Sequence, residues 1–276
     1  MTSGRQALPP VVKNLIIINT LMVLIQYVLG KQGIDLADTL GLHYWKSPLF
    51  KWWQPFTHMF MHGSYNDVSQ TLEHLFFNMF ALWMFGRILE NYWGAQRFLF
   101  FYLVCGLGAA FCHLAVMGYH FHTLEQAFQV YQQSPTLDHY NLFITQHNME
   151  SIPKFIEVHS VWQNDPSSVL QSNESIYWIH KYMLELYNEA TVGASGAVFG
   201  VLFAFGYLFP NALLYFFALV PIKAKWAVTI YAAIELFSGI RNSAGDNVAH
   251  FAHLGGMLFA FLLLKIWSNK SRNRIN

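Results

Sequence analysis

Long stretches of the chain contain no aspartate, glutamate, lysine or arginine. They include residues 14–30, 74–86, 98–124, 190–222 and 247–264. A helix needs about 20 apolar residues to cross the hydrocarbon core of a bilayer, and several of these stretches are that long. Charged residues make up only 11% of the chain, against roughly 25% in an ordinary soluble domain. We therefore expect an integral membrane protein, and the formal net charge of +1 offers no basic surface for nucleic acid.

The apolar stretches predict an all-α membrane protein with six transmembrane helices. The spans are expected near residues 12–29, 73–89, 97–118, 192–209, 225–240 and 248–267. This arrangement collects one acid, Glu90, and a set of bases on the same side of the membrane: Arg5, Lys13, Arg87, Arg97, Lys223, Lys225, Lys265, Lys270, Arg272 and Arg274. Basic residues near span ends mark the cytoplasmic face, so both termini are expected to be cytoplasmic. Residues 212–221 are either a hairpin or a segment that lies on the membrane surface.

Three parts follow from this topology. Residues 1–118 hold the first three spans and an aromatic-rich first external loop, and residues 192–276 hold the last three spans. Between them, residues 119–191 form a polar external insertion. Apolar residues repeat at helical spacing between Asn173 and Asn188, which predicts one amphipathic helix there. We interpret the insertion as a cap that packs on the membrane domain.

Polar and titratable side chains inside a membrane are costly, so those within the spans are candidates for function. They are His74, Asn78, His113, Ser195, Glu235, His250 and His253.

Ser195 and His253 are the strongest pair among these residues. If the spans are helical to their ends, the 1.5 Å rise per residue puts Ser195 about 9 Å and His253 about 10 Å below the same external surface. Glycines after His253 would let the sixth span approach Gly196 on the fourth closely, and an imidazole can convert a serine hydroxyl into a nucleophile. His250 is the second candidate for this base, one turn nearer the surface.

His74, Asn78 and Glu235 are the further candidates beside this pair. His74 and Asn78 are four residues apart and share one helix face, where they are either oxyanion donors or an interhelical polar contact. Glu235 is expected to make a structural or gating hydrogen bond, because no carboxylate follows His253 as a catalytic triad would require. The sequence thus favours a Ser-His dyad whose imidazole is oriented by packing against Phe199.

Together the motifs resemble the rhomboid family of intramembrane serine proteases. The matching segments are His74-Leu75-Phe76-Phe77-Asn78, Gly193-Ala194-Ser195-Gly196 and Ala252-His253-Leu254-Gly255-Gly256. They lie in the second, fourth and sixth predicted spans, in the order found in the family, and residues 53–62 look like its first external loop.

The resemblance implies that Ser195 is the nucleophile, His253 the base, and His74 with Asn78 the oxyanion donors. It implies a rhomboid-like bundle in a membrane, with the bacterial inner membrane as the expected location, and no cofactor or metal. The implied substrates are single-span membrane proteins, cut within or next to their transmembrane helix. The oligomeric state stays open.

The chain departs from the family pattern in three places. Gln54 follows Trp53 where relatives often have arginine, which leaves the anchoring of the first loop open. Phe199 stands where relatives often have tyrosine, and it keeps the ring without the hydroxyl. The insertion before Ser195 replaces a connection that is usually short, and it is expected to lie over the mouth of the active site.

Other classes of protein fit the sequence less well. A rhomboid-like protein that binds membrane clients without cutting them would typically have lost the serine or the histidine. A haem or metal protein would use His74, His113, His250 and His253, but the chain contains no H-E-x-x-H motif and these histidines lie at different depths. A channel or transporter would place its polar residues near the middle of the membrane rather than at one end.

Overall fold

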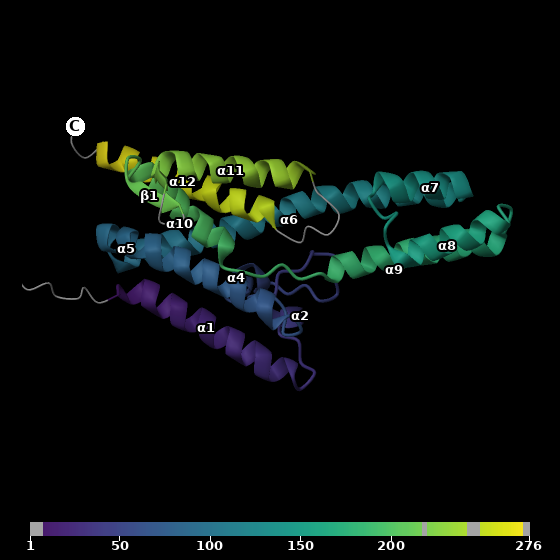
Figure 1. The fold of residues 1–276 in the computed structure, drawn as a ribbon, viewed down its shortest axis with the longest axis horizontal. Coiled ribbons are helices and arrows are strands. Elements are labelled where there is room, and N and C mark those ends of the chain that lie inside the picture. The colour runs from purple at the N-terminus through teal and green to yellow at the C-terminus, as the bar shows by residue number, and fades with distance from the viewer. Residues whose placement is uncertain (1–7, 217–219, 242–248, 273–276) are drawn as a thin grey trace, which may run out of the picture.

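The structure is a computed structural model that describes residues 8–216, 220–241 and 249–272. Its helices form one bundle, from which the insertion projects at one end (Figure 1). The bundle segments are α1 (Pro10–Gly30), α4 (Val68–Ala81) continued by the π turn η2 (Leu82–Gly86) and α5 (Arg87–Trp93), α6 (Ala95–Gln133), α10 (Ser195–Leu208), α11 (Ala224–Arg241) and α12 (His250–Arg272). They correspond to the six expected spans and confirm an all-α membrane bundle.

The length and composition of the helices show which of them could span a bilayer. Within the described residues, α1, α6 and α12 are long and apolar enough to cross a membrane, and α10 is a shorter apolar helix. The second segment begins earlier than the predicted residue 73, because Asp67 caps α4 by accepting a hydrogen bond from the Gln70 amide at 2.9 Å. The predicted start of the sixth span, residue 248, lies outside the described residues, as does Asp246 in the loop before it.

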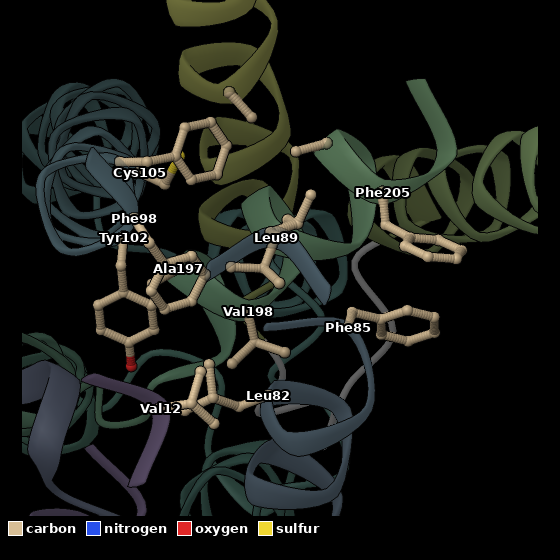
Figure 2. Packing of buried hydrophobic residues seen from close by; sticks show 14 of the residues in the cluster. Val12, Leu82, Phe85, Leu89, Phe98, Tyr102, Cys105, Ala197, Val198 and Phe205 are labelled. Carbon is tan, nitrogen blue, oxygen red and sulfur yellow. The ribbon is translucent and has the colours of Figure 1, made fainter. Parts of the chain in front are cut away.

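The core of the bundle is filled by large apolar side chains from α1, η2, α5, α6 and α10. Figure 2 shows Val12, Leu82, Leu89, Phe98 and Tyr102 in this cluster, and none of the five is exposed. In a bilayer, where lipid competes for apolar contact, such close packing is what holds helices together.

One end of the bundle, which we call the basic end, carries most of the lysine and arginine residues that flank the bundle helices. The start of α1, α5, the hairpin and the end of α12 meet there (Figure 1). Arg97 lies over the ring of Trp267 at 3.9 Å. The buried carboxylate of Glu90 accepts the amides of Val11 and Val12 at 2.9 and 2.8 Å, so it caps the N-terminus of α1. Arg5 and Arg274 lie outside the described residues.

Residues 212–221, left open by the sequence, belong to a hairpin. Strand β1 (Leu213–Phe216) pairs antiparallel with β2 (Val220–Lys223), with Leu214 opposite Ile222. The hairpin connects α10 to α11 at the basic end.

The loop between α1 and α4, which we call the first loop, contains α2 (Ala37–Leu40), α3 (Gln54–Thr57) and the 3-10 turn η1 (His58–Phe60). Gln54, which stands where rhomboid-family sequences often have arginine, is fully buried and anchors this loop. Its amide donates to the carbonyl oxygen of Leu49 at 2.8 Å and its oxygen accepts the His43 amide at 3.3 Å. Trp53 adds a bond from its indole nitrogen to the Thr39 oxygen at 2.9 Å.

The insertion is more helical than predicted. It contains the last turns of α6 and three helices, α7 (Leu137–Gln146), α8 (Pro153–Asn164) and α9 (Val169–Asn188). The predicted boundary after residue 118 is no break, because α6 runs without interruption to Gln133. The helices share a buried aromatic cluster with Tyr44 of the first loop. They extend the long axis of α6 beyond the end of the bundle (Figure 1), which we call the cap end.

Candidate active site

The segment that leads into Ser195 is extended, whereas the sequence predicted a helix from residue 192. Thr191 and Leu42 exchange two backbone hydrogen bonds of 2.8 and 2.9 Å, and the amide of Gly193 donates to the His58 oxygen at 3.0 Å. Gly193 has φ 131°, a value that L side chains rarely adopt and that no helix contains. The depth of about 9 Å calculated from a helical rise therefore does not apply to Ser195.

His113 also holds this segment in place. Its Nε2 lies 2.8 Å from the Thr191 hydroxyl oxygen. The first loop and α6 thus fix the backbone just before Ser195 from two directions.

Ser195 is the first residue of α10 and is partly exposed. Its backbone N–H belongs to the free, positively polarised N-terminus of the helix, where developing negative charge is stabilised. Its Oγ lies 2.8 Å from Nε2 of His253 on α12. The structure therefore brings together the two residues that the sequence paired.

Glycines allow α10 and α12 to lie this close, as expected. A methyl group on Gly256 would come within 1.8 Å of the carbonyl oxygen of Gly196, and one on Gly200 within 3.1 Å of the carbonyl oxygen of Gly256. Gly196 also faces the Ala109 methyl of α6, at 2.4 Å from where its own Cβ would be.

The imidazole of His253 is held by packing and by a carboxylate. The ring of Phe199 stacks on it, with centroids 4.1 Å apart and planes 3° from parallel, as the sequence suggested. In addition, Oε2 of Glu235 on α11 lies 2.9 Å from Nδ1 of His253. The expectation that packing alone orients the imidazole was therefore wrong. The spacing of Glu235 along the chain did not reveal that α11 turns it toward α12.

His250 is bound to the same carboxylate. Its Nδ1 lies 2.7 Å from Oε2 of Glu235, and its ring stands perpendicular to that of His253. The Ser195 hydroxyl is hydrogen-bonded to Nε2 of His253, so the geometry favours His253 over His250 as the base.

His74 lies against the backbone just before Ser195. A methyl group on Gly193 would be 2.9 Å from Nε2 of His74 and 3.5 Å from Oγ of Ser195, so these two atoms face a common small space. Asn78 is buried one turn further along α4, and its amide donates to the His74 carbonyl oxygen at 3.0 Å.

Two histidines of the first loop, which the sequence did not single out, lie near the site: His62 beside His74, and His58, whose carbonyl oxygen accepts the Gly193 amide. The ring of His62 lies 5.1 Å from that of His74, and both of its nitrogens are buried without a hydrogen-bond partner in the described residues. Burial lowers the pKa of His62 to about 3 and that of His58 to about 4. Both rings are therefore neutral and add no positive charge near the serine.

The histidines proposed as haem or metal ligands do not form one group. Among the described residues, ligand atoms of Glu235, His250 and His253 converge within 4.8 Å of one another. His113 is instead bound to Thr191, and His74 lies beside Gly193.

The comparisons with known proteins agree with the motifs. Residues 49–124 and 168–270 match the model of the Rhomboid domain family. The stretch between these two segments falls in the insertion, so most of the insertion lies outside the family match. A search of curated proteins found no match.

Proposed function

The chain belongs to the rhomboid family, and from this premise we propose that it is an intramembrane serine endopeptidase with Ser195 as nucleophile and His253 as base. The observation that carries the proposal is the 2.8 Å hydrogen bond between the Ser195 hydroxyl and Nε2 of His253, formed at the N-terminus of an apolar helix. An imidazole in this position removes the hydroxyl proton as the oxygen attacks a carbonyl carbon.

The surroundings supply the remaining parts of an acyl transfer. The tetrahedral intermediate carries an oxyanion, which needs hydrogen-bond donors beside the nucleophile. We infer that the backbone N–H of Ser195 and the ring N–H of His74 fill this role, and the Asn78 amide becomes a third donor if it leaves the His74 carbonyl oxygen. The proton then passes from His253 to the leaving amine as the peptide C–N bond breaks, which leaves an acyl group on Oγ of Ser195. His253 next removes a proton from a water molecule whose oxygen attacks the acyl carbon, and returns that proton to Oγ as the C–Oγ bond breaks.

The setting in an apolar bundle suggests the substrate. A serine near one end of a membrane bundle is suited to single-span membrane proteins, cut within or next to their transmembrane helix. The lysine and arginine residues gathered at the other end of the bundle favour cytoplasmic termini, which puts the serine near the external face. The family resemblance favours the bacterial inner membrane as the location. The reaction requires no cofactor or metal, and its partners are the bilayer and the membrane substrates.

Labelling with a fluorophosphonate, which reacts with activated serines, tests the proposal. The purified protein in proteoliposomes should be labelled, and Ser195→Ala and His253→Ala should each lose labelling and cleavage of a single-span reporter while remaining folded. Labelling that persists in Ser195→Ala would exclude Ser195 as the nucleophile. An active His253→Ala beside an inactive His250→Ala would exclude His253 as the base. A folded wild type that binds the reporter without labelling or cleavage would indicate a non-catalytic client-binding protein.

A further inference from the structure

Glu235 is a buried carboxylate that the reaction described above does not use. Its exposed fraction is 7%, and its neighbours along α11 are largely apolar. A charged group in such surroundings is costly unless its oxygens are satisfied by donors. Two imidazole nitrogens meet one of its oxygens, Nδ1 of His253 at 2.9 Å and Nδ1 of His250 at 2.7 Å.

This inference rests on the proposed function: we propose that Glu235 is a positioning residue that completes a Ser195–His253–Glu235 relay. An ionised carboxylate only accepts hydrogen bonds, so it holds the proton of His253 on Nδ1. The lone pair of Nε2 is then directed at the Ser195 hydroxyl, which is the tautomer that a general base requires.

The carboxylate of Glu235 also stabilises the protonated form of His253 during the reaction, and it stays ionised itself. As Oγ of Ser195 bonds to the substrate carbonyl carbon, its proton moves to Nε2 and His253 becomes a cation. Glu235 faces that cation through the Nδ1–H bond and lowers its energy. When the peptide C–N bond breaks, the proton leaves Nε2 for the amine, and the imidazole is neutral again.

His250 anchors the carboxylate within this arrangement. It lies one turn before His253 on α12, and both rings share Oε2 of Glu235. Phe199 restrains the ring plane of His253, whereas Glu235 restrains its tautomer. The two restraints are therefore separate and can be removed one at a time.

The first test compares two buried acids of the same bundle. Glu235→Gln keeps the shape and removes the charge, and Glu90→Gln does the same at the basic end, where Glu90 caps α1. With a single-span substrate in proteoliposomes, Glu235→Gln should lower kcat roughly 10²- to 10⁴-fold with KM within about twofold. Glu235→Asp should restore part of kcat. Glu90→Gln should lower only the unfolding temperature. Unchanged kcat in folded Glu235→Gln would overturn the proposal.

The second test reads the tautomer directly and does not depend on turnover. Nitrogen NMR of histidine-labelled Ser195→Ala protein, with the His253 signal assigned by its loss in His253→Ala, should show the proton on Nδ1. Adding Glu235→Leu should populate the Nε2–H tautomer, and adding Glu90→Gln should not. A tautomer insensitive to Glu235, or wild-type activity abolished by a chelator, would overturn the positioning role. A folded wild type without Ser195-dependent labelling would overturn the proposed function instead.

Discussion

At the scale of single residues, Gly193 controls the space in front of the Ser195 hydroxyl. A methyl group there would lie between Nε2 of His74 and Oγ of Ser195, at 2.9 and 3.5 Å. The first of these distances lies in the range of about 2.7–3.1 Å at which a hydrogen-bond donor meets an oxyanion. Glycine is required at position 193 because the backbone has a positive φ there, and because a side chain would fill the space beside the Ser195 hydroxyl.

Gly193→Ala should therefore remove labelling by the fluorophosphonate. The matched control is Gly33→Ala, because Gly33 also has a positive φ, 81°, but nothing lies within 4 Å of the added methyl. Both variants should lose about 1–2 kcal/mol of stability from backbone strain, measured by thermal unfolding. Only Gly193→Ala should lose labelling, by at least about a hundredfold. Equal labelling of the two variants would show that the space beside Ser195 is not used.

The neutral histidines of the first loop predict a dependence of stability on pH. The folded pKa values of His62 and His58, about 3 and about 4, lie below the unfolded value of 6.5. The unfolded chain therefore binds more protons as pH falls below 6.5, and stability decreases in that direction. Between pH 7.5 and pH 5 each histidine should cost about 2 kcal/mol.

Thermal unfolding of His62→Asn across this pH range tests the expectation. The variant should lose less stability on acidification than the wild type, because the ring that takes up a proton on unfolding is gone. Gln126→Asn, at an exposed uncharged position of α6, should retain the wild-type slope. Parallel curves for His62→Asn and wild type would show that His62 does not titrate on unfolding.

At the scale of elements, the sequence predicted where the helices lie. It predicted less well where each helix ends and which side of it faces the neighbouring helices. Uncharged stretches located the spans because burying charge in a bilayer is costly, and glycines pointed to the contact of α10 with α12. No helix end marks residue 118, because a fall in hydropathy does not stop a helix, and α6 continues to Gln133, just before the Ser134-Pro135 pair. Glu235 was recognised as polar, but its partners depend on the rotation of α11, which sequence spacing does not determine.

The contact of α10 with α12 should be intolerant of one added methyl group. In Gly256→Ala the new carbon would come within 1.8 Å of the Gly196 carbonyl oxygen, so the backbones must separate. We expect a loss of about 1–3 kcal/mol in unfolding free energy. Labelling of Ser195 should slow at least about tenfold, because Ser195 and His253 lie on the two separated helices. Ser268→Ala, at an exposed position of α12, should change neither quantity.

At the scale of the whole molecule, the insertion is joined to the segment that carries the serine. Glu125 of α6 pairs with Lys46 of the first loop at 2.7 Å and accepts the Tyr187 hydroxyl of α9 at 2.6 Å. The Ser47 hydroxyl donates to Asn188 at 2.6 Å. Only a few residues follow before Thr191, whose backbone pairs with Leu42 of the same loop. The insertion thus helps to hold the approach to Ser195, although most of it lies outside the family match.

Breaking this junction should affect the active site from a distance. Glu125→Leu removes the ion pair with Lys46 and the acceptor for Tyr187, which should release the segment before Ser195. We expect a fall of roughly two- to tenfold in the labelling rate, since small misplacements of a nucleophile are costly. Lys154→Met breaks a surface ion pair with Glu157 inside α8 and should leave the rate unchanged. If both variants react like the wild type in proteoliposomes, the extended segment is held by the first loop and His113 alone, and the insertion acts separately from the serine.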